Sequence, residues 1–377
     1  MVPCICWSNV HSRRWFGTNA ERSGALSGIP GDAVVFTLEA QAAVRGTVCS
    51  SPRELGGNVL RALEDTVADY KVVEPSRLVD KWYRTAAVAD YGSAEAAATY
   101  LGGYGPRSIL KYQESILGLF CLKGFIPRAL SVVDFGAGPC VGFAALVDLL
   151  TLLGGILGEE FSLSYRAVDR SPAMLAVGRA LCNRIMERAV MRTTYDASEP
   201  SDLHLSPETL LVLANVMNES EGNLDCGVFL HALLQQLPRV QDVVVIEPAT
   251  EQPSRQLCGL GARLELFSHV GPCPSAGSAC TEWSFRDFAK RVYSCERYCL
   301  GKWAPSAARC KFSMAMLSKV QAERRLAGDD LVVVGQRLGT GQAVTCRRGD
   351  KRVMRLAPEV QPWDLVTADG RIKEWWP

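Results

Sequence analysis

The sequence predicts an α/β protein built around a mostly parallel sheet. An apolar segment from Leu130 to Phe135 runs into a glycine turn, and a second apolar segment ends on Asp169. Beyond Pro127, extended and helical patterns alternate along the chain, which is typical of parallel strands joined by helices on both faces of a sheet. The chain has 377 residues, 48% of them hydrophobic, so it can bury a globular core.

The segment before Pro127 predicts helices. Apolar residues recur at helical spacing from Asn58 to Tyr70 and again from Ser108 to Leu122. We therefore expect a helical N-terminal part in front of the sheet.

The strands and helices of the sheet follow in order. The first strand covers Ser131–Phe135, and a helix follows from about Val141 to Leu153. The second strand ends at Asp169, after which Ser171 and Pro172 have the residue types of an N-cap and a first helical position. The next predicted elements are two strands and a helix, at Thr209–Ala214, Asp242–Ile246 and Gln256–Phe267.

Glycine or polar residues follow each of these strands. Because the carboxyl ends of parallel strands line one crevice of an open sheet, we expect these residues to converge there. They are Gly136, Gly138, Asp169, Asn215 and Glu247. Glu247 stands directly before Pro248, so capping of the next turn is the alternative to a role as pocket acid.

The last third of the chain changes character. Ser268–Ala308 does not continue the strand and helix rhythm, whereas Lys311–Ser318 resumes a strand. Leu331–Trp375 consists of short strands between glycine-rich turns, which predicts a small β module. The expected parts are a transit peptide or disordered tail, a helical domain, a sheet domain with an insertion at 268–308, and the β module, at residues 1–30, 31–127, 128–320 and 321–377.

The first thirty residues predict a mitochondrial transit peptide, with a disordered tail as the alternative. Arg13 and Arg14 lie among Ser, Trp and Phe residues, and no acid precedes Glu21. Fourteen cysteines without short-loop spacing favour a reducing compartment. No uninterrupted apolar run has the length of a membrane span. We therefore expect a protein of the mitochondrial matrix without membrane contact.

The glycine turn points to a nucleotide-type cofactor. Gly136 and Gly138 allow the backbone to approach a ligand closely, and Asp169 stands where a carboxylate accepts hydrogen bonds from ribose hydroxyls. The spacing is not the Gly-x-Gly-x-x-Gly of a dinucleotide site. Asp134-x-Gly-x-Gly instead resembles motif I of the class I methyltransferases, which implies S-adenosylmethionine as the ligand. The implied cofactor-binding residues are Asp134, Gly136, Gly138, Asp169 and Asn215.

Cys140 departs from that motif, because it stands where a third glycine is common. We expect its side chain to crowd the amino-acid end of the cofactor. A cysteine is small, however, so the residue does not by itself exclude binding.

A wider set of residues resembles one family. These residues are Tyr100-Leu101, Asp134 to Pro139, Val168 to Ser171, Glu247-Pro248, the Pro-Cys-Pro turn around Cys273, Trp283, Lys311-Phe-Ser313 and Cys346. Together they resemble the methyltransferase-like assembly factors of the mitochondrial small ribosomal subunit. The resemblance implies a factor that meets immature small-subunit ribosomal RNA, ribosomal proteins and other assembly factors.

The same resemblance implies a metal site. In that family four cysteines hold a four-iron cluster, and the positions that match are Cys273, Cys280 and Cys346. The fourth position is Ser284, whose hydroxyl is a poorer iron ligand than a thiolate. Three cysteines with His269 could instead hold zinc, and loss of the metal is the third alternative.

The overall charge is +1, but it is unevenly distributed. From Arg286 to Arg355 there are sixteen Lys or Arg residues and six Asp or Glu residues, an excess of ten positive charges. This segment predicts a basic face that could meet RNA phosphates, whereas a surface balanced by neighbouring acids is the alternative. The candidate RNA-binding residues are Arg286, Arg291, Arg297 and Lys302.

No catalytic residue can be named from the sequence. Asn215-Val-Met-Asn218 lacks the proline and aromatic residues that accompany methylation of an exocyclic base nitrogen, and no cysteine stands there as a nucleophile for carbon methylation. Two hypotheses therefore remain. The chain is a binding and assembly factor that uses a methyltransferase fold, or it is an active methyltransferase that modifies ribosomal RNA or a ribosomal protein.

Overall fold

The computed structural model describes residues 31–37, 39–41, 43–44, 56–72, 92–198, 200, 209–219, 225–248, 256–257, 260–271, 293–294, 311–320, 331–333, 342–347, 350–355, 365–366 and 372–374. No helix among these residues is long and apolar enough to cross a membrane.

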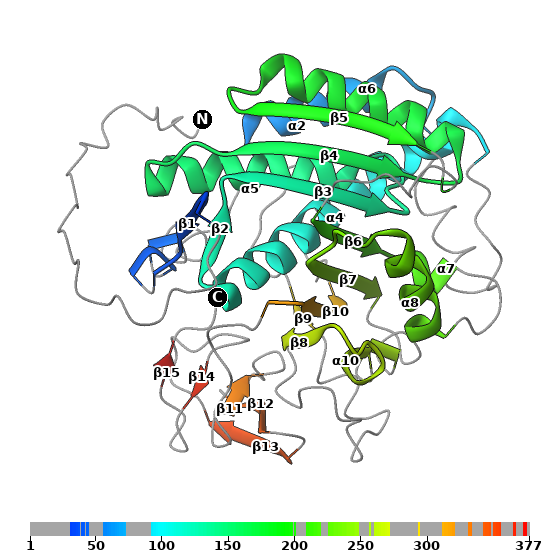
Figure 1. The fold of residues 1–377 in the computed structure, drawn as a ribbon. Helices are drawn as coiled ribbons and strands as arrows, with labels where there is room; N and C mark the ends of the chain where they lie inside the picture. The colour runs from blue at the N-terminus through cyan, green and yellow to red at the C-terminus, as the bar shows by residue number, and fades with distance from the viewer. Residues whose placement is uncertain are drawn as a thin grey trace.

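Within the described residues, eight strands form the central sheet (Figure 1). They are β3 (Ala129–Phe135), β4 (Ser162–Val168), β5 (Arg192–Ser198), β6 (Leu210–Ala214), β7 (Asp242–Pro248), β8 (Ser268–Gly271), β9 (Tyr293–Ser294) and β10 (Lys311–Ser318). Their order is β5-β4-β3-β6-β7-β10-β8, with β9 beside β10. The first five strands of this order are parallel, and β10 runs antiparallel to both β7 and β8. Five parallel strands followed by one reversed strand form the sheet of a class I methyltransferase fold, as the sequence predicts.

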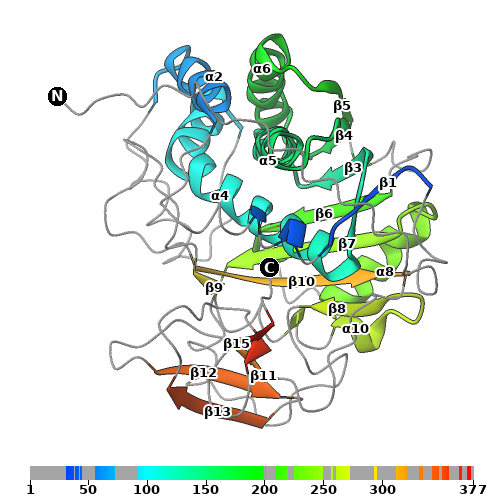
Figure 2. The same ribbon diagram turned by 90° about the vertical axis from the view of Figure 1, so that its left-hand side faces the viewer.

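The helices lie on both faces of this sheet (Figure 2). They are α2 (Gly57–Ala68), α4 (Ala94–Lys123), α5 (Val141–Leu157), α6 (Pro172–Arg188), α7 (Val216–Glu219), α8 (Cys226–Gln236) and α10 (Leu260–Arg263). Successive side chains of β3 lie on opposite faces of the sheet, because side chains alternate along a strand. Val132 belongs to the core formed with α4, α5 and α6, and Val133 to the core formed with α8 and α10. Strands buried on both faces explain the continuous apolar runs of the sequence.

Within its described residues, the N-terminal part contains the two helices that the sequence predicts, α2 and α4. Strands β1 (Ala33–Val35) and β2 (Phe125–Pro127) pair with each other, so the start of the N-terminal part lies beside its end. Ser93 caps α4 by accepting a hydrogen bond from the N–H of Ala96 at 3.1 Å, and Gly124 ends the helix with φ 72°. Helix α2 is tied to α6 by two ion pairs, Arg184 with Asp69 and Arg188 with Asp65.

Most predicted elements of the sheet match the structure to within a few residues. Helix α5 extends to Leu157, four residues beyond its predicted end, and Ser171 caps α6 by accepting a hydrogen bond from Met174 N–H at 3.2 Å. The predicted helix over Gln256–Phe267 is too long, because α10 ends at Arg263.

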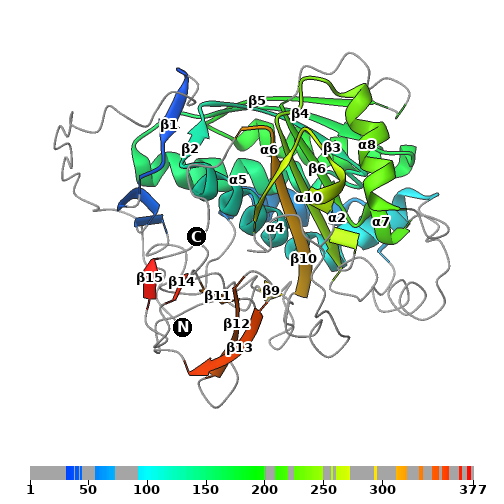
Figure 3. The ribbon, with the colours of Figure 1, turned by 60° about the horizontal axis from the view of Figure 1, so that its bottom comes forward.

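Two findings concern the last third of the chain. The prediction that the sheet rhythm stops at Ser268 is wrong for residues 268–271, which form β8 and pair with β10. The predicted C-terminal strands are present and form a separate antiparallel sheet (Figure 3). Its strands are β11 (Leu331–Val333), β12 (Gln342–Arg347), β13 (Asp350–Arg355), β14 (Leu365–Val366) and β15 (Ile372–Glu374), in the order β13-β12-β11-β14-β15.

Candidate functional site

The turn after β3 needs its glycines. Gly136 and Gly138 have φ values of +76° and +54°, a region that side chains with a Cβ disfavour. A Cβ at Gly136 would also lie 2.5 Å from Cγ2 of Val216, so another residue would clash with the start of α7. The N–H groups of Gly136 and Ala137 donate to the carbonyl oxygen of Val168 at 2.7 and 3.1 Å, which ties the turn to the end of β4.

Asp169 joins this turn to helix α6. Its Oδ2 accepts a hydrogen bond from Gly138 N–H and its Oδ1 accepts one from Ser171 N–H, both at 2.8 Å. Burial raises the pKa of the carboxyl, while the two backbone N–H groups and the nearby Arg170 act in the opposite direction. Each carboxylate oxygen has a second lone pair, so Asp169 can hold the turn and still accept hydrogen bonds from a ligand.

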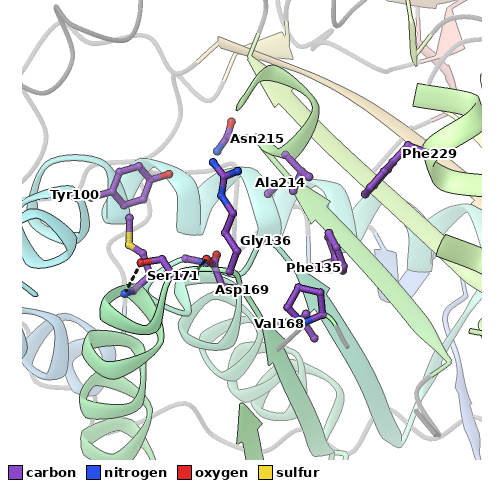
Figure 4. A pocket seen from close by; sticks show the side chains of 14 residues that line it. Tyr100, Phe135, Gly136, Val168, Asp169, Ser171, Ala214, Asn215 and Phe229 are labelled. Atoms are coloured by element: carbon purple, nitrogen blue, oxygen red, sulfur yellow. Dashed lines mark hydrogen bonds between the residues drawn. The ribbon is translucent and has the colours of Figure 1, made fainter. Parts of the chain in front are cut away.

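A pocket of about 230 Å³ opens at the carboxyl ends of β3, β4 and β6, and we call it the strand-end pocket (Figure 4). Four of the five predicted cofactor-binding residues line it, namely Gly136, Gly138, Asp169 and Asn215. The other lining residues are Tyr100, Phe135, Val168, Arg170, Ser171, Met174, Pro200, Ala214, Val216 and Phe229. The structure thus brings the predicted strand ends together, and their role in holding a cofactor stays a prediction.

Asn215 adopts an unusual backbone conformation at the pocket wall. Its φ is +62°, a value that asparagine tolerates better than most residues, and its N–H donates to the carbonyl oxygen of Ile246 at 2.8 Å. This geometry fixes the residue between β6 and α7. The amide side chain therefore lies at the strand-end pocket, where it can both donate and accept a hydrogen bond.

Asp134, the fifth predicted residue, does not line the pocket. It is fully buried behind the turn, where the Tyr112 hydroxyl lies 3.0 Å from both carboxyl oxygens and the Tyr165 hydroxyl donates to Oδ2. Burial raises the pKa of Asp134 to about 7, although the two tyrosine hydroxyls favour the charged form. A Cβ at Gly142 would lie 2.3 Å from Oδ2, so α5 can approach this carboxyl only with a glycine there. Asp134 therefore links β3 to α4 and β4.

The prediction for Cys140 needs correction. This residue has φ +58° and is fully buried, but it is not among the residues that line the strand-end pocket. Its Sγ lies 3.6 Å from the Tyr195 hydroxyl and only 2.4 Å from where a Cβ at Gly178 would stand. The thiol therefore fills space between α5, α6 and β5 and does not crowd a ligand.

Glu247 does not line the strand-end pocket, although the sequence suggested that it would. Its side chain is fully buried, and Oε1 accepts a hydrogen bond from Met217 N–H at 2.9 Å. The observed partner is the start of α7, which follows β6, whereas the turn after Pro248, which the alternative named, lies outside the described residues. Glu247 fixes the start of α7 and, through it, the neighbouring Asn215.

Sequence reasoning missed several lining residues. Tyr100 comes from α4 and Phe229 from α8, and nothing in the local sequence of either helix marks a pocket residue. Arg170 and Pro200 follow β4 and β5 directly, so the rule about strand ends could have found both.

The metal and RNA predictions fall mostly outside the described residues. Cys273, Cys280, Arg286, Arg291, Arg297 and Lys302 lie there entirely. Cys346 is placed by its backbone alone, in β12 opposite Val332 of β11 and Lys351 of β13. In the part of the chain that the structure describes, no group of three or more His, Cys, Asp or Glu side chains could hold a metal ion.

Solved structures similar to this chain include methyltransferases. Magnesium protoporphyrin IX methyltransferase from Synechocystis, solved with bound SAH, shares 12% identity over 65% of this chain and 94% of its own, with a TM-score of 0.29. A class I S-adenosylmethionine-dependent methyltransferase from Listeria monocytogenes shares 11% identity over 76% of this chain and 91% of its own, with a TM-score of 0.32. An S-adenosyl-L-methionine-dependent methyltransferase from Methanococcus maripaludis shares 18% identity over 41% of this chain and 64% of its own, less than two thirds, with a TM-score of 0.27. At such scores these likenesses carry no argument, and the fold assignment rests on the strand order.

Sequence comparison identifies the family. No curated protein sequence matches the chain. A family model, described as mitochondrial small ribosomal subunit Rsm22, matches residues 121–347, which is more than half of the chain and includes the glycine turn, Asp169, Asn215 and most of the basic segment. The chain therefore belongs to the Rsm22 family of the mitochondrial small ribosomal subunit.

Proposed function

We propose that this chain is an assembly factor for the mitochondrial small ribosomal subunit that binds immature ribosomal RNA in the matrix. The observation that carries the proposal is the family match over residues 121–347. It covers both the methyltransferase-like sheet and the region between Arg286 and Arg347, where most of the excess positive charge lies.

The charge distribution supports contact with RNA. An excess of ten positive charges between Arg286 and Arg355 suits a surface that neutralises phosphates, while the remainder of the chain carries the compensating acids. Each phosphate contact releases condensed counterions, so binding of this kind weakens steeply as salt rises. We propose Arg286, Arg291, Arg297 and Lys302 as the residues that make these contacts.

Charge reversal tests this proposal. We expect Arg291→Glu with Lys302→Glu to weaken binding to small-subunit ribosomal RNA and to lower the slope of log affinity against log salt by roughly one per lost contact. Arg239→Glu is the matched control, because Arg239 is an exposed cation in the turn between α8 and β7. Equal retention of RNA by the double variant and the control would reject the proposed surface.

A second candidate function is methyl transfer. The position of the Cys140 thiol supports this candidate. Because the thiol points away from the strand-end pocket, the departure from the glycine motif leaves the pocket open. The lining residues fit an adenosyl ligand. Asp169 has free lone pairs for ribose hydroxyls, Gly136 and Gly138 admit close approach, and Phe135, Val168 and Phe229 provide apolar walls.

In such a reaction the bound S-adenosylmethionine would supply an electrophilic methyl group. The chain would contribute positioning, since Asp169 and the turn orient the nucleoside and the amide of Asn215 can hold an acceptor group by hydrogen bonds. Titration calorimetry with S-adenosylmethionine and S-adenosylhomocysteine tests the pocket. Heat from both ligands, with no methyl group incorporated into the ribosomal RNA or proteins of the small subunit, would show that the pocket binds the cofactor without methyl transfer. Absence of heat would reject the cofactor pocket.

The metal site belongs to the same proposal. Cys273, Cys280 and Cys346 provide three thiolates for an iron–sulfur cluster, and Ser284 leaves the fourth ligand to another residue. Protein purified without oxygen should contain iron and sulfide and absorb visible light. Bound zinc, or no metal, would contradict the cluster.

A further inference from the structure

One wall of the strand-end pocket comes from outside the sheet domain. Thirteen of the fourteen lining residues lie in β3, β4 and β6, in the segments that follow the strands, or in α6 and α8. The remaining one is Tyr100, the seventh residue of α4, in its second turn after Ala94. Figure 4 shows its ring at the pocket with Asn215, Ser171 and Asp169. Tyr100 is thus the residue by which the N-terminal helical part, α2 and α4, reaches the pocket.

Helix α4 has a weak joint directly after Tyr100. The sequence Gly102-Gly-Tyr-Gly-Pro106 lies inside the helix, where each glycine costs up to about 1 kcal/mol relative to alanine. Pro106 has no N–H to donate to the carbonyl of Gly102, so one helical hydrogen bond is missing at this point. The helix can therefore bend between Gly102 and Pro106 at lower cost than elsewhere.

Both sides of this segment are packed. After it, the Tyr112 hydroxyl binds the buried Asp134, and Gln113 Nε2 donates to Ala145 O at 3.2 Å and to Asp148 Oδ2 at 2.7 Å. Before it, Ala97, Ala98 and Leu101 are fully buried in the main core. The Tyr100 ring stacks on Tyr104, with centroids 5.3 Å apart and an interplanar angle of 29°, which orients the ring at the pocket.

We propose that Tyr100 is a ligand-contacting residue, carried to the strand-end pocket on the second turn of α4. The inference rests on the proposed adenosyl ligand of this pocket. The ring of Tyr100 packs against the bound nucleoside. This contact is apolar and needs no exact hydrogen-bond geometry, because it uses the aromatic face.

Substitution at Tyr100 tests the contact with S-adenosylhomocysteine as the probe. We expect Tyr100→Ala to raise the Kd about tenfold, mainly through faster dissociation, Tyr100→Leu to give a smaller loss, and Tyr100→Phe to stay within about twofold of the unaltered chain. Tyr70→Ala is the matched control, because Tyr70 belongs to the same helical part and does not line the pocket. Thermal unfolding of each variant identifies any that does not fold.

The outcomes separate this inference from the proposed function. If the unaltered chain binds no S-adenosylhomocysteine, the cofactor pocket and the role of Tyr100 are both rejected. If it binds, and folded Tyr100→Ala and Tyr100→Leu bind equally well, only the role of Tyr100 is rejected.

Discussion

At the scale of single residues, the buried carboxyl of Asp134 is the most unusual group near the site. It has no basic partner among the contacts described here, and its hydrogen bonds come from the hydroxyls of Tyr112 and Tyr165. Neutral donors compensate only part of the cost of burying a carboxylate, so burial dominates and raises the pKa of Asp134 to about 7.

This pKa predicts a pH-dependent stability. Between about pH 4 and the folded pKa of about 7, the unfolded chain loses the Asp134 proton while the folded chain keeps it, so the free energy of unfolding falls as pH rises. The stabilising contribution of Asp134 is complete below the pKa of its carboxyl in the unfolded chain and is lost above about pH 7. It amounts to roughly 4 kcal/mol of unfolding free energy in total. Urea unfolding of the unaltered chain and of Asp134→Asn across this range measures it. Parallel profiles for the two proteins would contradict the raised pKa.

Asp169 has a structural role in the glycine turn, and we propose that it also binds the cofactor. We expect Asp169→Ala to release the N–H groups of Gly138 and Ser171, to lower the free energy of unfolding by about 1–3 kcal/mol, and to abolish binding of S-adenosylhomocysteine. Asp169→Asn keeps one acceptor oxygen and should lose less stability. Asp196→Asn is the control, because Asp196 is an exposed carboxylate on β5. Wild-type stability and affinity in Asp169→Ala would contradict both roles.

The sequence predicts residues well where the backbone dictates the residue type. Gly136 and Gly138 are recognisable because their positive φ excludes most other residues, and Asp169 because it ends a parallel strand beside them. The direction of a side chain is harder to predict. Cys140 and Glu247 stand at expected positions in the chain, but packing against Gly178 and the start of α7 turns them away from the pocket.

At the scale of elements, the contact of α5 with α6 depends on a cysteine and a glycine. A Cβ at Gly178 would lie 2.4 Å from Cys140 Sγ and 3.0 Å from the carbonyl carbon of Pro139. We expect Gly178→Ala to destabilise the chain by about 1–3 kcal/mol, and by less in a Cys140→Gly background, where the sulfur is absent. A double-mutant cycle of unfolding free energies measures the coupling. Strict additivity would show that Cys140 and Gly178 do not share this space.

A buried ion pair joins the last residue of α4 to the first residue of β7. Lys123 Nζ lies 2.5 Å from Asp242 Oδ2, and Ser318 Oγ donates to Asp242 Oδ1 at 2.6 Å. Lys123→Met would leave a buried carboxylate without its cation, so we expect a loss of roughly 3–5 kcal/mol in unfolding free energy. Arg188→Met, which breaks the more exposed pair with Asp65, should cost about 1 kcal/mol or less. Similar costs for the two variants would contradict the difference in burial.

The pattern of elements is predictable where strands are buried on both faces. β3, β6 and β7 appear as continuous apolar runs, and the glycine or polar residues at their ends mark where they stop. β8 is only four residues long and pairs with β10 more than forty residues later in the chain. Such a short strand is defined by its partner, so no local pattern could reveal it.

At the scale of the whole molecule, the fold and the function are separate conclusions. The strand order establishes a class I methyltransferase fold, but such folds serve many functions, so the fold alone does not assign one. The family match supplies the link to the mitochondrial small ribosomal subunit, and the charge of residues 286–355 supplies a physical reason to expect RNA. The strand-end pocket is a cavity at the carboxyl ends of the strands, the place where folds of this kind bind ligands.

Purification of the tagged chain from mitochondria tests the central claim most directly, with sequencing of the RNA and identification of the proteins that accompany it. The account predicts immature small-subunit ribosomal RNA and small-subunit proteins, strongly enriched over those of the large subunit, and lost when Arg291 and Lys302 are reversed in charge. Recovery of both subunits in equal amounts, or of no ribosomal RNA, would contradict it.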